Sequence, residues 1–144
     1  MGYTHYWYRK PKLDGPNFAK VSKDFMSILP SLGCKIAGSD GSGSPDITND
    51  LIMFNGVGKY AHETFMLELE SNSINDKLKF EFCKTARKPY DMAVQVCLLI
   101  AKYHFKNEFE VSSDGDMEDW EEAILLCEKH FKHSFNFEFG RSDE

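Results

Sequence analysis

Three basic side chains fall within five positions at a predicted strand-to-helix junction: Lys84, Arg87 and Lys88. Thr85 adds a hydroxyl group there, and Pro89 suits the first turn of the helix that follows. The first amides of a helix have no intrahelical acceptor, and the helix dipole favours negative charge at that end. Arg87 can bind a phosphate or carboxylate through two parallel hydrogen bonds. The junction predicts an anion site; the alternative is a solvated loop whose charges pair with the acidic residues of the chain.

A second junction, Ser112 to Asp116, also leads from a predicted strand into a helix. Ser113 and Asp114 are common helix N-cap residues, and with Ser112 they also offer hydroxyl, amide and carboxylate contacts to a ligand. A calcium loop is a poor fit, because the twelfth position counted from Asp114 is Leu125 where that loop needs a glutamate. A magnesium ion held by Asp114 and Asp116 is the minor alternative to capping, and we predict no metal site.

Aromatic side chains near both ends of the predicted sheet could stack on a nucleobase, above all Trp7 and Tyr90, with His5 beside them. Packing in the core is the alternative for these rings. For an enzyme, His5, Tyr90 and Asp91 are the acid–base candidates. The sequence shows no GxSxG motif and no recognisable Ser/His/Asp arrangement. Cys83 follows a strand beside Lys84, where the pKa of a thiol can be lowered, but a structural cysteine is the favoured interpretation.

The totals bound these hypotheses. The chain has 144 residues, enough for one domain with a real core, and 42% of them are hydrophobic and 14% aromatic. There are 17 basic and 23 acidic residues, a net charge of −6, which repels a phosphate backbone and argues against general nucleic-acid binding. The four cysteines are widely spaced without a CxxC pair, which favours a reducing compartment. No stretch predicts a signal peptide or a membrane helix, so we expect a cytoplasmic protein.

The periodicity of apolar residues predicts elements that could position these groups. Alternation predicts strands over 3–8, 51–54, 65–69, 78–82, 109–111 and 135–139, with a further short strand over 34–37. The strands between 51 and 82 are expected to form one antiparallel meander. Helical spacing predicts helices over 16–29, 93–101 and 116–132, the second of them apolar nearly all round and therefore central. The glycine- and serine-rich segment 38–45 predicts a mobile surface loop, of the kind that closes over a ligand.

These elements predict the α+β class: an antiparallel sheet with about three helices packed mainly on one face. Residues 1–140 are expected to form a single globular domain, and residues 141–144 a short tail. The two junctions would then lie at the edge of the sheet.

Five segments resemble a group of small uncharacterised proteins encoded by bacterial and bacteriophage genomes. They are MGYTHYW at 1–7, FNG at 54–56, ETF at 63–65, FCKTARKPYD at 82–91 and FEVSSDGDMEDW at 109–120. The resemblance covers most of the chain and implies a bacterial or viral setting. It implies no activity and no catalytic residue.

The leading hypothesis is a binding protein for an anionic, nucleotide-derived small molecule. Basic residues would hold the phosphate or carboxylate, rings would stack on the base, and the second junction would add polar contacts; the predicted ligand-binding residues are His5, Trp7, Lys84, Thr85, Arg87, Lys88, Tyr90, Asp91, Ser112, Ser113 and Asp114. In a bacteriophage such a protein would sequester a nucleotide signal of host immunity. One alternative is an enzyme for a phosphorylated or nucleotide substrate, and another is an inhibitory or partner-binding protein that uses the acidic helix 116–122. No cofactor is predicted, and the oligomeric state stays open.

Overall fold

The computed structural model describes residues 2–71 and 78–140. In chain order its elements are β1 (Thr4–Arg9), α1 (Gly15–Ile28), β2 (Asp46–Ile47), β3 (Leu51–Phe54), β4 (Phe65–Glu68), β5 (Lys79–Lys84), α2 (Asp91–Phe105), β6 (Phe109–Ser113) and α3 (Met117–Phe131). Three short 3₁₀ turns, at Leu29–Ser31, Gly58–Tyr60 and Lys106–Glu108, connect them. The predicted tail, residues 141–144, lies outside the described residues.

Two antiparallel three-stranded sheets carry the strands. One has the order β5-β1-β6 and the other β2-β3-β4. The first strand of the chain is the centre of the larger sheet, and its register pairs His5 with Cys83 on one side and with Ser113 on the other. The start of β1 therefore lies beside the ends of both β5 and β6.

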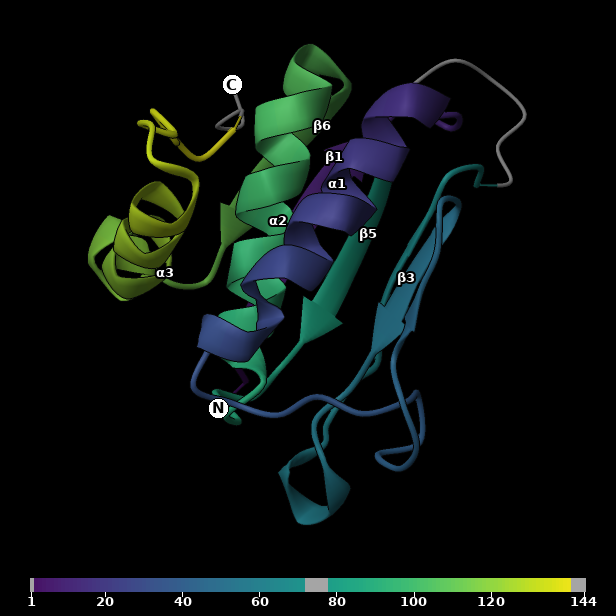
Figure 1. Cartoon of the computed structure of the whole chain (residues 1–144), viewed down its shortest axis with the longest axis vertical. Helices are drawn as coiled ribbons and strands as arrows, with labels where there is room; N and C mark the ends of the chain where they lie inside the picture. Colours follow the sequence, from purple (N-terminus) through teal and green to yellow (C-terminus); the bar gives the residue numbers. More distant parts are fainter. Residues whose placement is uncertain (1, 72–77, 141–144) are drawn as a thin grey trace.

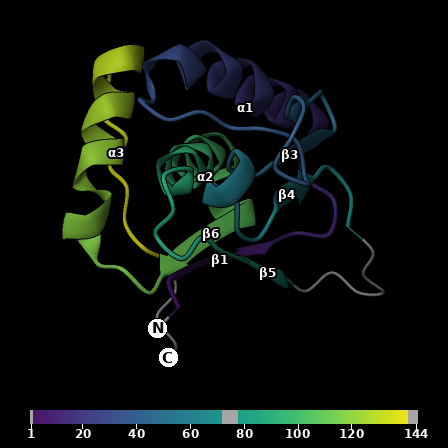
Figure 2. The same cartoon turned by 90° about the horizontal axis from the view of Figure 1, so that it is seen from below.

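Helix α2 lies in the middle of the molecule, between α1 and α3 on one side and the β5-β1-β6 sheet on the other (Figures 1 and 2). Its sequence explains this position: all residues from Ala93 to Ala101 are buried, so no face of these turns is left for water. No described helix covers the opposite face of this sheet (Figure 2). That face carries Tyr6 and Tyr8 with the exposed rings of Phe80 and Phe82.

The two flanking helices begin at polar caps. In α1 the Asp14 carboxylate accepts from the amide of Asn17, and Pro16 stands in the first turn. In α3 the Asp116 carboxylate accepts from the amide of Asp119, whose own carboxylate accepts from the amide of Asp116. This reciprocal capping box fixes the helix start at Asp116, so the prediction that Ser113 or Asp114 caps the helix is wrong.

The α+β class, the antiparallel strands and the three helices are confirmed, but the grouping of the strands is not the expected one. The predicted meander over 51–82 is divided, because β3 and β4 pair in one sheet whereas β5 pairs with β1 in the other. The segment predicted as a strand over 34–37 makes only an isolated bridge between Ala37 and Asn55.

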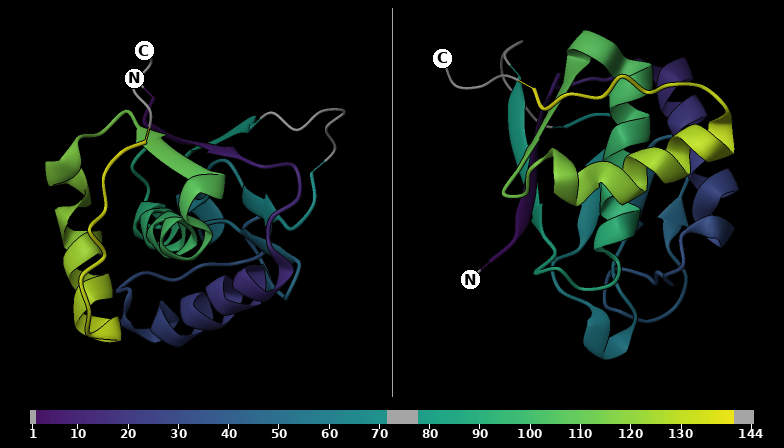
Figure 3. Two further views of the ribbon diagram at one scale, coloured as in Figure 1. Left: turned by 90° about the horizontal axis from the view of Figure 1, so that it is seen from above. Right: turned by 90° about the vertical axis from the view of Figure 1, so that its left-hand side faces the viewer.

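The segment after α3 forms no described strand, contrary to the prediction for 135–139. It returns along α3 to the edge of β6 (Figure 3), where the amide of Gly140 donates to the carbonyl oxygen of Val111. The alternating rings that suggested a strand instead pack on Trp120, with ring centroids 5.2 Å away for Phe137 and 5.6 Å for Phe139. The alternation of aromatic residues in this segment therefore reflects the packing of Phe137 and Phe139 on the Trp120 indole, not strand pairing.

Candidate functional site

A cluster of polar side chains lies at the end of the larger sheet where β1 begins. We call it the His5 cluster: Tyr3, His5, Thr85, Asp91 and Ser113. The register of β1 brings His5 next to Ser113 at the end of β6, and Asp91 is the first residue of α2, which packs on the same face of the sheet. Residues from both ends of the chain therefore meet here because β1 is the central strand.

The imidazole of His5 joins two oxygen atoms in one chain of hydrogen bonds. Its Nδ1 lies 2.8 Å from Ser113 Oγ, and its Nε2 lies 2.7 Å from Asp91 Oδ1. The hydroxyl of Thr85 donates to the same oxygen of Asp91. The amide of Gly115 donates to Ser113 Oγ at 2.9 Å. The sequence analysis found no Ser/His/Asp arrangement, and the fold builds one from three elements far apart in the chain.

The hydrogen bonds also indicate where the proton on the imidazole lies. An ionised carboxylate can only accept, so Nε2 carries the hydrogen that points to Asp91. When the ring is neutral, Nδ1 is then an acceptor to which the Ser113 hydroxyl donates. The site thus holds a serine hydroxyl aimed at a base, which is in turn oriented by a carboxylate.

Tyr3 and Arg87 cover this cluster. The Arg87 guanidinium carbon lies 3.8 Å from the centroid of the Tyr3 ring, and Arg87 Nη1 lies 3.9 Å from a carboxylate oxygen of Asp119. The Tyr3 hydroxyl is buried and has no hydrogen-bond partner among the described residues. Burial, and then the carboxylates of Asp91 and Asp119, raise the pKa of Tyr3, while Arg87 and the nearby Ser113 side chain oppose the shift; the group therefore stays a hydroxyl donor.

The basic loop from Lys84 to Lys88 differs from the predicted anion site. Its amides are occupied: those of Thr85 and Ala86 donate to the carbonyl of Tyr3, and that of Lys88 donates to the carbonyl of Thr85. The amide of Asp91 donates to the carbonyl of Lys88. The expected cradle of free amides before α2 is therefore not formed. Any anion binding by this loop rests on its side chains.

This loop is also strained. Ala86 and Arg87 both have positive φ angles, 53° and 58°, in consecutive positions without glycine. That conformation costs about 1–3 kcal/mol per residue and persists only where surrounding contacts enforce it. Here the amides of Thr85 and Ala86 donate to the carbonyl of Tyr3, and the Arg87 side chain contacts the Tyr3 ring.

A pocket of about 290 Å³ lies on the far side of the same loop. We call it the Tyr90 pocket; it is lined by Lys35, Gly56, Val57, Tyr60, Pro89 and Tyr90. The hydroxyl of Tyr90 donates to the carbonyl oxygen of Glu63, which holds the ring in place. An added Cβ at Gly56 would lie 2.2 Å from the carbonyl oxygen of Tyr60, so only glycine lets the 56–60 turn close this tightly.

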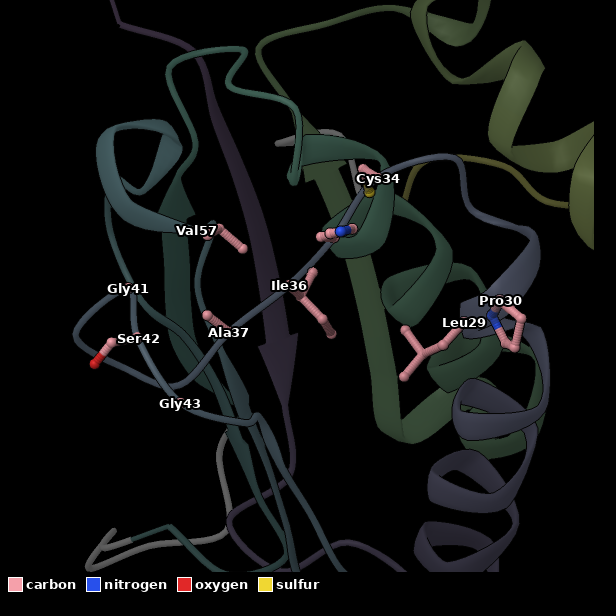
Figure 4. A pocket seen from close by; sticks show the side chains of 10 residues that line it. Leu29, Pro30, Cys34, Ile36, Ala37, Gly41, Ser42, Gly43 and Val57 are labelled. Atoms are coloured by element: carbon pink, nitrogen blue, oxygen red, sulfur yellow. The ribbon is translucent and has the colours of Figure 1, made fainter.

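A second pocket of about 440 Å³ adjoins the first and shares Lys35 and Val57 with it. We call it the Cys34 pocket (Figure 4). Leu29 and Pro30 border it at the end of α1, and the glycine-serine segment borders it from the opposite side through Gly41, Ser42 and Gly43. That segment is tied down by the Gly58 amide, which donates to the carbonyl of Gly41. The segment singled out in the sequence thus forms one wall of a pocket.

Several predicted ligand contacts are directed elsewhere. Trp7 is only 1% exposed and donates its indole N–H to Glu81, so it cannot stack on a ligand. Tyr90 lines the Tyr90 pocket but is fully buried, so its ring has no exposed face for a base to stack on. Ser112 lies opposite Tyr6 on the helix-free face of the sheet, away from Ser113.

Asp114 and Asp116 are separated by their structural roles. The two carboxylate oxygens of Asp114 accept from the amide of Thr4 and from the hydroxyl of Tyr6, whereas Asp116 caps α3. In the described part of the chain, no group of three or more His, Cys, Asp and Glu side chains is placed to hold a metal ion. Magnesium binding by this pair is therefore not proposed.

Cys83 is a structural cysteine. Its thiol is buried, and burial raises its pKa to about 12, with a hydrogen bond to Tyr90 acting in the opposite direction. A lowered thiol pKa beside Lys84 was the alternative, and it is wrong because Cys83 points to the core while Lys84 points to solvent.

Four contributors were not predicted from the sequence: Asp119, Lys35, Gly56 and Tyr60. The Asn55-Gly56 pair gave a turn signal, but nothing local tied that turn to Pro89 and Tyr90. Lys35 stood in a segment expected to be a strand. Their convergence depends on which loops meet, and periodicity within one segment does not report this.

No protein-family model, curated protein or solved structure matches this chain. Among the described helices, none has the length and apolar character needed to cross a membrane. The argument for function therefore rests on the two pockets and the His5 cluster.

Proposed function

We propose that this protein binds an anionic, nucleotide-derived small molecule in the Tyr90 pocket. The observation that carries the proposal is a pocket with two tyrosines and a lysine in its lining, on a chain whose net charge is −6. Pockets of about 300–1,000 Å³ that combine apolar walls with a few polar groups are typical ligand sites.

The aromatic part of the ligand would contact Tyr60. This ring is 48% exposed and stands on the 3₁₀ turn Gly58–Tyr60, with Pro89 across the pocket. Stacking of a base on an aromatic ring contributes about 1–3 kcal/mol and tolerates different bases. Tyr60 thus takes the stacking role that the sequence analysis assigned to Trp7.

The anionic part would lie at the lysines around the pocket. Lys35 lines both pockets, and Lys59 Nζ lies 5.3 Å from the centroid of the Tyr60 ring. Lys88 directly precedes Pro89 in the chain. Because the Cys34 pocket shares Lys35 and Val57 with the Tyr90 pocket, a ligand longer than a base would extend past Lys35 toward Ser42.

Charge reversal at Lys35 tests the proposal. We expect Lys35→Glu to weaken the binding of nucleotides at least tenfold and to change the binding of the matching uncharged nucleosides little. Isothermal titration calorimetry with nucleoside 5′-monophosphates and cyclic nucleotides measures both. Because Lys35 is exposed, the melting temperature of the Lys35→Glu variant should stay within a few degrees of wild type.

Lys20→Glu is the matched control, because it makes the same charge change on the exposed side of α1. If Lys20→Glu weakens binding as much as Lys35→Glu, the effect is one of overall charge and the pocket is not the site. Absence of binding by every nucleotide in the panel would overturn the proposal outright.

A reducing, cytoplasmic setting belongs to the same proposal. It is supported by the cysteines, since Cys34, Cys83, Cys97 and Cys127 are all free thiols in the fold.

A further inference from the structure

We propose that Ser113 is a nucleophile activated by His5 and Asp91, and that it cleaves carboxylic esters through an acyl-serine intermediate. This inference goes beyond ligand binding and does not depend on the Tyr90 pocket. It is carried by the unbroken chain of hydrogen bonds from Ser113 Oγ through His5 to Asp91, with contacts of 2.8 and 2.7 Å.

The three groups have the environments that these roles need. His5 is wholly buried, so its ring is shielded from water and fixed between two partners. Ser113 is partly exposed at the end of β6. Asp91 is oriented by a second donor, the hydroxyl of Thr85. A nucleophile, a base and a residue that orients the base are the three parts of the serine-hydrolase arrangement.

The imidazole is used in the reverse orientation to the familiar triad, with Nδ1 toward the serine and Nε2 toward the carboxylate. The two nitrogens exchange roles without changing the chemistry, because the neutral ring carries one donor and one acceptor in either tautomer. The nearest internal comparison is His104, whose Nε2 lies 2.7 Å from Asp24 but which has no serine in its contacts.

A donor for the developing oxyanion stands beside the nucleophile. The Tyr3 hydroxyl is buried without a hydrogen bond of normal geometry, and it lies beside Gly115 and the Ser113 side chain, whose Oγ accepts from the Gly115 amide. An added Cβ at Gly115 would lie 2.3 Å from this hydroxyl, so glycine is what lets the two groups come together. Arg87 lies over the Tyr3 ring and offsets the charge of the Asp119 carboxylate, which also borders Gly115. Oriented donors of this kind stabilise the tetrahedral intermediate of acyl transfer.

The reaction balances with water as the only other reactant. Ser113 Oγ attacks the ester carbonyl carbon while its proton passes to His5 Nδ1, and Asp91 stabilises the imidazolium that forms. The carbon–oxygen bond to the alcohol breaks, and the alcohol leaves with the proton from His5. Water then attacks the acyl-serine, giving a proton to His5, which returns it to Ser113 Oγ as the carboxylic acid is released.

The test is labelling of the full-length protein with a fluorophosphonate probe, with the modified residue located by tandem mass spectrometry. We expect an adduct on Ser113 that is lost in Ser113→Ala and forms at least tenfold more slowly in Asp91→Asn. Ser112→Ala, one residue away on the opposite face, and Asp24→Asn, in the comparison His–Asp pair, should label at the wild-type rate.

Tyr3→Phe separates a catalytic role from a structural one. The hydroxyl it removes makes no hydrogen bond of normal geometry but lies beside the Ser113 side chain, so the melting temperature should change by no more than a few degrees while the labelling rate falls about tenfold or more. The proposal is overturned if Ser113 carries no adduct, or if its adduct forms equally fast in Asp91→Asn and Tyr3→Phe. Lys35→Glu should be labelled at the wild-type rate, because this centre does not depend on the nucleotide pocket.

Discussion

Cys83, Cys97 and Cys127 lie with their thiols in the core, whereas Cys34 is partly exposed beside the start of α2. Burial raises the pKa of Cys83 and of Cys127 to about 12, and it raises the pKa of Cys97 further. With these raised pKa values the three thiols are protonated at neutral pH, and burial shields them from solvent. Because only the thiolate is a good nucleophile, they should be unreactive. At the residue scale, position in the fold decides reactivity.

Thiol titration should therefore resolve one cysteine from three. With a disulfide reagent at pH 8 we expect one thiol to react in the native protein and all four to react in guanidinium. Burial also raises the pKa of Cys34, so its rate should still increase above pH 9 instead of levelling near the usual value of about 8.5. Cys34→Ser should remove the native phase; any reactive thiol in the native form of that variant would contradict the burial described.

The 56–60 turn shows how a connecting element can be specified by a single residue. Gly56 is buried between the carbonyl of Tyr60 and the ring of Tyr90, whose Cδ1 would lie 3.1 Å from an added Cβ. The neighbouring Asn55 anchors the same turn, because its side-chain oxygen accepts from the amides of Gly56 and His62. The close approach of Gly56 to Tyr60 and the hydrogen bonds of the Asn55 side chain together place Tyr60 at the pocket.

Gly56→Ala should destabilise the protein by about 1–3 kcal/mol, because the close atom is a backbone carbonyl that cannot move freely. Urea denaturation measures this loss in the free energy of unfolding. Nucleotide binding by Gly56→Ala should weaken as well. Gly15→Ala is the matched control, since an added Cβ there meets nothing within 4 Å and Gly15 begins α1. It should leave stability unchanged or raise it by a few tenths of a kcal/mol.

At the scale of the whole molecule, Arg9 connects the two sheets. It ends β1 in the larger sheet, is fully buried, and donates to the carbonyls of Glu68 and Leu69 at the end of β4. The Arg9 guanidinium also donates to the carbonyls of Lys10 and Pro11, and its Nη1 lies 3.9 Å from Glu81 Oε1. Burial lowers the pKa of Arg9, while Glu81 and Glu68 oppose that shift. One guanidinium thus satisfies backbone groups that neither sheet can pair alone.

Arg9→Met should cost about 3–5 kcal/mol of stability, because it fills the space but leaves several buried carbonyls and Glu81 without their donor. Lys12→Met is the control from the same connection. The Lys12–Glu70 pair spans 3.6 Å, but its side chains are 72% and 67% exposed, so its loss should change stability by less than about 1 kcal/mol. Equal losses in both variants would mean that Arg9 does not link the sheets.

The sequence by itself determined the α+β class, the bounds of β3 and the central place of α2. These features follow from periods of 2 and 3.6 residues, which are local and survive in any arrangement of the elements. It also singled out the loop before α2 and the end of β6 as places where polar groups gather.

Only the tertiary structure decided how these pieces meet. The division of the strands into two sheets, the link between Ser113, His5 and Asp91, and the pocket between Lys35, Tyr60 and Tyr90 all join residues far apart in the chain. Such contacts explain why two predictions were wrong. The amides of Thr85 and Ala86, expected to be free for an anion, donate to the carbonyl of Tyr3, and Trp7, expected to stack on a base, is buried in the core. A side chain's chemistry depends on its partners and on access to water, and long-range packing sets both.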